Sequence, residues 1–249
     1  MTASVDNDLW ARRYQPAPDA AVRLICFPHA GGAASAYLPF AQTLSPQLDV
    51  VAMQYPGRQD RRSEPFLPTI AAMADAALEP VLALADRPIA LFGHSMGASV
   101  AFEVARRMEA RGIVPRALIA SGRRAPSRHR DESVHTKGDN ALIAEMKALS
   151  GTDTKVLADD EILRMILPVV RNDYRAAETY RWQPGDPLST PIHVHFGQND
   201  PKVSAEEAQA WREHTTAEFT TTPYPGGHFY LNNELPRLSQ AITAALGGR

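Results

Sequence analysis

Short apolar stretches alternate with amphipathic helical patterns along this chain, and no other feature restricts the possible fold as much. Strand-like runs that are apolar, β-branched or alternating occur at residues 22–27, 49–54, 89–92, 116–121, 191–196 and 218–224. Between them, apolar residues recur three or four positions apart at residues 34–44, 70–84, 97–111, 205–214 and 234–246. This order predicts an α/β fold in which helices flank a mostly parallel central sheet.

One segment breaks the alternation. Residues 126–187 contain no convincing strand, but residues 140–150 and 159–180 have helical patterns, the second interrupted by Pro168. In an α/β enzyme, such an insertion often forms a lid over the catalytic edge of the sheet. With 249 residues and 44% apolar content, we expect a single domain over residues 1–249 that carries a helical lid at about 126–187.

The charge balance argues against some classes of partner. A net charge of -2 and a pI near 6.4 provide no overall attraction to nucleic acid or to anionic membranes. The chain begins without a signal-like apolar segment and contains no run long enough to span a bilayer. Its single cysteine, Cys26, leaves no internal disulfide and fits a reducing compartment. These features predict a cytoplasmic protein.

The segment LFGHSMGASV at residues 91–100 places Ser95 between two glycines, after an apolar strand and at the start of a helix. This strand–turn–helix setting is typical of a nucleophile elbow, in which a sharp turn displays the serine hydroxyl above the sheet. Gly93 and Gly97 would allow the strand and helix backbones to approach each other. The alternative is a serine that only caps the helix N-terminus.

A nucleophilic serine needs a general base, and His228 is the best candidate. It lies in YPGGHFYL, after the last expected strand and before the last helix, where a loop can carry it over the sheet edge. The other downstream histidines fit packing or surface positions: His129 and His135 lie in a polar loop, His193 and His195 within a strand, and His214 at the end of a surface helix. The alternative for His228 is a loop residue that caps the final helix.

The base in turn needs an acid that orients it. Asp200 follows the strand at 191–196 in FGQNDPKV, and Pro201 ends the turn. The competing position is the loop after residues 116–121, which reads GRRAPSRHR and offers no carboxylate before Asp131. Asp200 is therefore preferred, with a simple Asx-turn as its non-catalytic explanation.

The developing oxyanion needs two backbone donors. One is expected to be the amide of Met96, directly after the nucleophile, and the other the amide of Ala30 in the glycine-rich loop FPHAGGAASAY at residues 27–37. A tight strand-to-helix turn would also use the glycines of this loop. Cys26 and His29 adjoin it, and Cys26 fits a core position in the strand.

Several sequence segments together resemble those of the type II thioesterases, which are discrete editing hydrolases of polyketide and nonribosomal peptide assembly lines. They are CFPHAGGAASAY, QYPGR, FGHSMGA, LPVVRNDYRAAETY, FGQNDPKV and PGGHFYL. The resemblance preserves their order and spacing and extends from Trp10 nearly to the C-terminus. The resemblance implies an α/β-hydrolase fold, a triad of Ser95, Asp200 and His228, and an oxyanion hole at Ala30 and Met96. It also implies an acyl or peptidyl carrier protein as partner, with the acyl group on its phosphopantetheine arm. The reaction that it implies requires no metal or cofactor.

Two further hypotheses concern how that partner would bind. Because carrier proteins are typically acidic, arginines could form a docking face; the candidates are Arg58, Arg61, Arg62, Arg123, Arg124, Arg128 and Arg130. A solvated charge run explains them equally well. Within the lid, Met146, Met165 and Ile166 could line an acyl chamber. We expect the protein to be a monomer.

Three other functions remain compatible with these residues. A carboxylesterase or lipase acting on small esters would use the same triad, a hydrolase fold without activity could serve as a binding module, and an acyltransferase would replace water by a second nucleophile.

Overall fold

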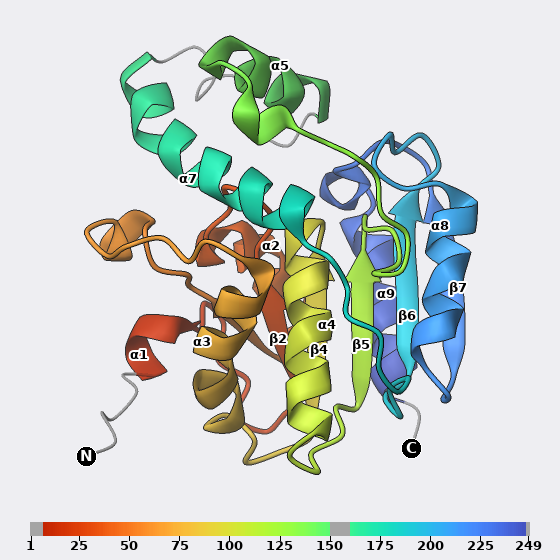
Figure 1. Ribbon diagram of the computed structural model, residues 1–249. Helices are drawn as coiled ribbons and strands as arrows, with labels where there is room; N and C mark the ends of the chain where they lie inside the picture. The colour runs from red at the N-terminus through yellow and green to blue at the C-terminus, as the bar shows by residue number, and fades with distance from the viewer. Residues whose placement is uncertain (1–6, 150–159, 248–249) are drawn as a thin grey trace.

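The computed structural model describes residues 7–149 and 160–247, and these residues form a seven-stranded sheet with helices on both faces (Figure 1). The strands are β1 (Ala11–Arg12), β2 (Arg23–Phe27), β3 (Asp49–Met53), β4 (Ile89–His94), β5 (Ala117–Ser121), β6 (Ile192–Gly197) and β7 (Phe219–Tyr224). The α-helices are α1 (Asn7–Trp10), α2 (Leu38–Leu44), α3 (Ile70–Leu82), α4 (Met96–Glu109), α5 (Asp139–Leu149), α7 (Asp160–Thr179), α8 (Ala205–Gln209) and α9 (Leu235–Gly247). Short 3-10 helices cover Ala34–Tyr37, Gln59–Arg61, Val134–Thr136, Ala210–His214 and Tyr230–Asn232.

The sheet has the strand order β1-β3-β2-β4-β5-β6-β7, and every neighbouring pair from β3 to β7 is parallel. Only β1 pairs antiparallel, against β3 at the edge of the sheet. β2 to β6 are buried at every position, as expected for parallel strands covered by helices on both faces. Their carboxyl ends lie at one edge, where ligands bind in open α/β sheets.

Two apolar layers hold the helices to the sheet. On one face, α3 and α4 pack on the sheet through residues such as Met73 and Val104, together with Trp211, which is fully buried. On the other face, α2 and α9 pack through Phe40 and Ile242. Figure 1 shows α3 and α4 in front of the sheet and α9 behind it. This double coverage keeps the sheet rigid beneath the loops at its carboxyl edge.

The lid crosses the carboxyl edge of the sheet. Figure 1 shows α5 and the long helix α7 above the strands, and they share a small apolar cluster that includes Leu142, Met146, Leu163 and Val170. The expected helices at 140–150 and 159–180 correspond to α5 and α7, although Ser150 and Asp159 lie outside the described residues. Pro168 lies inside α7 without ending it.

The predicted fold class is confirmed, with differences at the ends of elements. The expected strands match β2 to β7 within two residues, but β1 was not predicted. The helix expected at 34–44 begins as a 3-10 turn, and the one expected at 205–214 ends as one, where i→i+3 bonds tighten a short turn. The single-domain description of residues 1–249 remains a prediction.

Candidate active site

Ser95 occupies a sharp turn between β4 and α4. Its backbone has φ 55° and ψ -120°, a conformation that non-glycine residues rarely adopt. The turn is tight because a Cβ at Gly93 would lie 2.2 Å from the Gly97 carbonyl oxygen, and one at Gly97 would lie 2.0 Å from the Phe27 oxygen. The Ser95 amide donates to the Ser121 carbonyl at 2.8 Å. This geometry matches the elbow expected from the sequence.

The structure brings Ser95, His228 and Asp200 together. His228 Nε2 lies 2.9 Å from Ser95 Oγ, and its Nδ1 lies 2.9 Å from Asp200 Oδ2 and 3.0 Å from Oδ1. His228 and Asp200 are buried, with 3% and 8% exposure. Ser95 stands at the N-cap of α4, but its side chain makes no capping hydrogen bond. The geometry therefore favours a reactive hydroxyl over a helix cap.

Loop packing at the ends of β6 and β7 positions the acid and the base. The Asn199 amide donates to the Gly226 carbonyl at 2.9 Å, and a Cβ at Gly197 would lie 2.2 Å from the Gly227 oxygen. Asp200 Oδ1 also accepts the Lys202 amide at 2.8 Å, which is an Asx-turn. Asp200 thus forms the turn and orients the imidazole at the same time.

The glycine-rich loop after β2 leaves one amide available beside the nucleophile. The Gly31 amide donates to Asp173 Oδ2 at 2.8 Å and the Gly32 amide to the His29 carbonyl at 2.9 Å. In the described part of the chain, neither the Ala30 amide nor the Met96 amide donates a hydrogen bond to another group. Both residues line the same cavity as Ser95. This arrangement suits two donors to an oxyanion.

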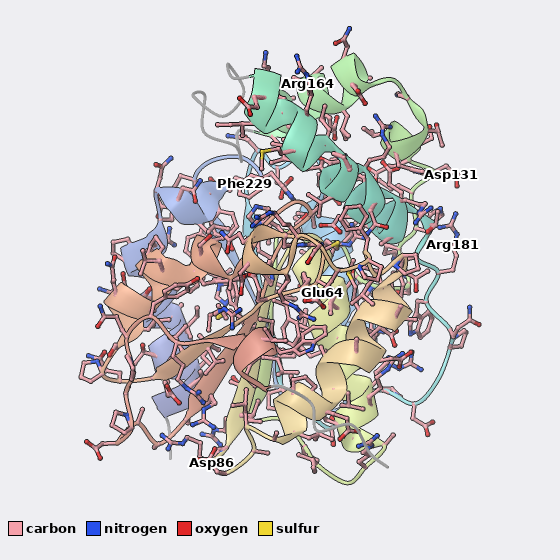
Figure 2. The ribbon with its side chains drawn as sticks, turned by 90° about the vertical axis from the view of Figure 1, so that its left-hand side faces the viewer. Glu64, Asp86, Asp131, Arg164, Arg181 and Phe229 are labelled. Atoms are coloured by element: carbon pink, nitrogen blue, oxygen red, sulfur yellow. The ribbon has the colours of Figure 1, made fainter. Side chains whose placement is uncertain are left out.

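An aromatic cluster supports the imidazole of His228. The His94 ring lies 5.0 Å from the His228 ring, and Phe229 packs against both. Burial lowers the pKa of His29 to about 4 and that of His94 well below its usual value, so both rings stay neutral. His94 Nδ1 lies 2.9 Å from Ser121 Oγ. Apart from its contact with Asp200, His228 therefore packs against uncharged rings. No sequence motif indicated this role for Phe229, which Figure 2 shows where the core meets the lid.

Buried neutral histidines predict a loss of stability in mild acid. Burial lowers the pKa of His195 to about 3, and an unfolded histidine titrates near 6.5. Below about pH 6.5 the unfolded chain therefore binds a proton that the native state refuses, so stability present above that pH declines as the pH falls toward about 3. We expect His195→Asn to reduce the slope of unfolding free energy against pH by up to about 1.4 kcal/mol per unit, measured by urea denaturation. Equal slopes in the wild type and in His195→Asn would contradict the prediction.

A cavity of about 440 Å³ opens beside Ser95. Most of its apolar wall comes from the lid, from Met146, Leu149, Ile166, Val170 and Ala177. The suggestion that Met146 and Ile166 line an acyl chamber agrees with this lining. Met165 does not line the cavity; it is 67% exposed, because it points to the outer side of α7.

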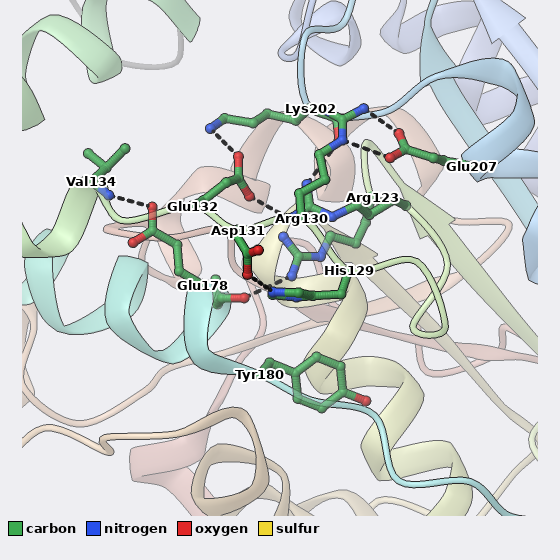
Figure 3. A network of polar contacts seen from close by, with 12 residues as sticks. Arg123, His129, Arg130, Asp131, Glu132, Val134, Glu178, Tyr180, Lys202 and Glu207 are labelled. Atoms are coloured by element: carbon green, nitrogen blue, oxygen red, sulfur yellow. Dashed lines mark hydrogen bonds and ion pairs between the residues drawn. The ribbon is translucent and has the colours of Figure 1, made fainter.

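Charged residues form another part of the cavity wall (Figure 3). Lys202 Nζ lies 2.9 Å from Glu132 and 2.5 Å from Glu145, and Glu132 also pairs with Arg124. These cations hold the pKa of Glu132 at about 2 despite its partial burial. The network joins the loop that carries Asp200 to the lid, and the sequence offered no signal for it because the partners are far apart along the chain.

The arginines do not form the free basic face considered from the sequence. Arg58, Arg61 and Arg124 are buried. Arg128 pairs with Glu213, and Arg130 pairs with Glu207. Most of this charge is therefore ion-paired within the chain rather than free to meet a partner.

Arg123 and Arg62 differ from that group. Arg123 donates to Ser99 Oγ and the Ala177 carbonyl, both at 3.0 Å, and it lines the cavity. Burial lowers its pKa to about 10. Arg62 is exposed.

The alternative acid and histidines lie elsewhere. Asp131 has a 97% exposed side chain that contacts His129, and Figure 2 shows it near Arg181, away from Phe229. His193 and His195 pack within β6, as expected. His214 was expected on a surface helix but is only 3% exposed, because it packs against Phe102 and Trp182.

Two broader features bear on function. Among residues 7–149 and 160–247, no cluster of three or more histidine, cysteine, aspartate or glutamate side chains could hold a metal ion. No helix in the same residues combines the length and the apolar character needed to cross a membrane.

Comparison with known proteins relates this geometry to one family. Residues 22–246 match the model of the thioesterase domain. The chain is 52% identical to a probable cadicidin biosynthesis thioesterase of Streptomyces griseus, covering 95% of this chain and 66% of that protein. It is 49% identical to thioesterase PikA5 of Streptomyces venezuelae, covering 96% and 86%. The structure of the type II thioesterase BorB from the borrelidin biosynthetic cluster matches with a TM-score of 0.91 and 50% identity, over 96% of this chain and 98% of that one.

Proposed function

Because this chain belongs to the thioesterase family, and within it to the type II thioesterases, we propose that it hydrolyses acyl thioesters on the phosphopantetheine arm of acyl or peptidyl carrier proteins. In this role it would remove stalled or wrongly primed units from a polyketide or nonribosomal peptide assembly line. The observation that carries the proposal is the Asp200–His228–Ser95 series of hydrogen bonds at the mouth of a cavity walled by the lid.

The first half of the reaction transfers the acyl group to the enzyme. His228 Nε2 accepts the Ser95 proton as the hydroxyl oxygen attacks the thioester carbonyl, and Asp200 stabilises the imidazolium that forms. The Ala30 and Met96 amides donate to the developing oxyanion. Collapse of the tetrahedral intermediate breaks the carbon–sulfur bond and expels the thiolate, which takes a proton from His228 and leaves as the thiol. A thiol with a pKa near 8.5 leaves easily, so protonation demands little of the site.

The second half regenerates the enzyme. Water enters the cavity and gives a proton to His228 as its oxygen attacks the acyl-Ser95 carbonyl. The same two amides stabilise the second oxyanion, and Ser95 recovers its proton from His228 as the acid leaves. The steps proposed for these residues require no metal or bound cofactor.

The lining of the cavity suits an acyl chain. Apolar lid residues provide most of its hydrophobic wall, and the Lys202–Glu132 pair provides a polar part. Since the arginines are mostly ion-paired, we propose that recognition of the carrier depends on the arm and the acyl group more than on a broad basic face. We further propose that the protein works as a cytoplasmic monomer.

A direct comparison of substrates tests the proposal. An acylated carrier protein and a p-nitrophenyl ester with the same acyl group are given to the enzyme, and kcat/KM is measured for each. We expect the carrier substrate to be preferred by at least about tenfold, since binding of the non-reacting arm can be used to lower the barrier. Intact-protein mass spectrometry of several acylated carriers would show which acyl groups are removed. A strong preference for the free ester would instead identify a small-ester hydrolase.

A further inference from the structure

The lid helix α7 packs directly on the glycine-rich loop that carries Ala30. A Cβ at Gly31 would lie 2.6 Å from Val170 Cγ2, and Gly31 has φ +74°, so this position requires glycine. Residues three apart lie on one face of a helix. Asp173 therefore reaches the same loop one turn after Val170.

The carboxylate of Asp173 binds the loop and an arginine at once. Its Oδ2 accepts the Gly31 amide at 2.8 Å and Arg58 Nη1 at 3.0 Å, and its Oδ1 accepts Arg58 Nη2 at 3.0 Å. Arg58 Nη1 also donates to the Gly32 carbonyl at 3.1 Å. One ion pair thus holds both the amide of Gly31 and the carbonyl of Gly32, directly after Ala30.

The environment makes this pair rigid and intolerant of change. The Asp173 side chain is fully buried and that of Arg58 is 5% exposed. Asn172 Nδ2 lies 3.3 Å from Asp173 Oδ1, and the Tyr55 ring packs 5.0 Å from the Arg58 guanidinium. Within the described residues, Arg58 Nε has no hydrogen-bond partner, so this guanidinium relies on Asp173 and the loop carbonyl. Loss of either partner would leave a buried charge uncompensated.

We propose that Asp173 is a positioning residue which, through the Gly31 amide and Arg58, holds the Ala30 amide where it can donate to the oxyanion. The inference rests on the proposed role of Ala30 in catalysis. Because Asp173 belongs to α7, which also walls the cavity, the oxyanion hole is complete only when this helix is seated on the loop. A lid that covers the substrate therefore also contributes to the transition state.

Replacement of Asp173 by asparagine tests the proposal. The asparagine side chain keeps the shape of the aspartate but lacks its charge. Only one of its two terminal atoms, the oxygen, can accept hydrogen bonds from Arg58 and Gly31. We expect kcat to fall about 10- to 100-fold with KM changed less than about threefold, as for a displaced oxyanion donor. Asp139→Asn is the matched control, because it removes a lid ion pair with Arg171 on the exposed surface, and it should retain wild-type kcat.

A second measurement separates positioning from general damage. An alkyl boronic acid forms a tetrahedral adduct with Ser95 and places an oxygen in the oxyanion hole, whereas a non-hydrolysable acyl-pantetheine amide resembles the ground state. We expect Asp173→Asn to weaken inhibition by the boronic acid by about the same factor as kcat and to leave affinity for the amide within about threefold. A folded variant with wild-type kcat, or with reduced kcat but unchanged boronic acid inhibition, would overturn the proposal.

Arg58→Lys provides the same test if Asp173→Asn does not fold. Lysine keeps the charge but loses the two-pronged contact, so kcat and boronic acid inhibition should again fall together. The kinetic and inhibition assays also work with the p-nitrophenyl ester as substrate. The test of Asp173 therefore stays valid even if the enzyme does not act on carrier proteins. If Ser95→Ala is inactive while Asp173→Asn and Arg58→Lys fold and hydrolyse normally, only the positioning role is wrong.

Discussion

Replacing Ser95 with alanine is expected to reduce kcat for thioester hydrolysis by about 10⁵-fold or more, as for other serine hydrolases that lose their nucleophile. The hydroxyl is the group in contact with His228 Nε2, so without it no acyl-enzyme can form. Intact-protein mass spectrometry should detect an acyl adduct on the wild-type protein and none on the variant. A fluorophosphonate probe should likewise label only the wild type.

Ser35→Ala is the matched control for the nucleophile. Ser35 lines the same cavity, but its hydroxyl accepts from Gln59 at 2.7 Å instead of contacting a histidine. We expect this variant to keep kcat within about threefold and to be labelled normally. If Ser95→Ala retained turnover or labelling, the proposed mechanism would be wrong.

The second large effect is expected from Asp200→Asn, which should lower kcat by about 10⁴-fold. An asparagine keeps the Lys202 turn contact through its carbonyl oxygen, but it cannot hold His228 Nδ1 in the protonated tautomer as a carboxylate does. The imidazole would then present a protonated Nε2 to Ser95, and this nitrogen could not accept the hydroxyl proton. Stopped-flow or spectrophotometric measurement of thiol release gives kcat for both proteins.

Asp131→Asn distinguishes the two candidate acids. Because the Asp131 side chain is 97% exposed and contacts His129, its replacement should leave kcat unchanged. The reverse pattern, with activity lost in Asp131→Asn and kept in Asp200→Asn, would reassign the acid to the lid. Thermal unfolding of both variants checks that each remains folded.

Local patterns were sufficient to predict most of the fold. The buried strands are mostly apolar, and their alternation with helical patterns predicted β2 to β7 within two residues. β1 could not be predicted, because two residues carry no periodic pattern and its pairing depends on the edge of β3. Likewise, the burial of His214 depends on aromatic neighbours contributed by other parts of the chain.

The catalytic residues could be predicted because each of them follows a strand in the expected order along the chain. Ser95 follows β4, Asp200 follows β6 and His228 follows β7, and the carboxyl ends of these parallel strands share one edge. The ion-pair partners of the arginines were harder to predict. Arg58 and Asp173 are 115 positions apart. Arg124, Arg128 and Arg130 resemble a surface run until their carboxylate partners are placed. Charge pairing over such separations is decided by tertiary structure, which local patterns do not encode.

The close backbone contacts at Gly93 and Gly97 also determine where acyl preference can be re-engineered. Any side chain at either glycine would collide with a neighbouring peptide at 2.2 Å or less, so saturation libraries at the elbow would yield mainly misfolded protein. Ile166, Val170 and Ala177 line the cavity from a helix that spans the sheet edge. Directed evolution of chain-length selectivity should therefore sample Ile166 and Ala177, and leave both the turn around the nucleophile and the contact of Val170 with Gly31 as they are.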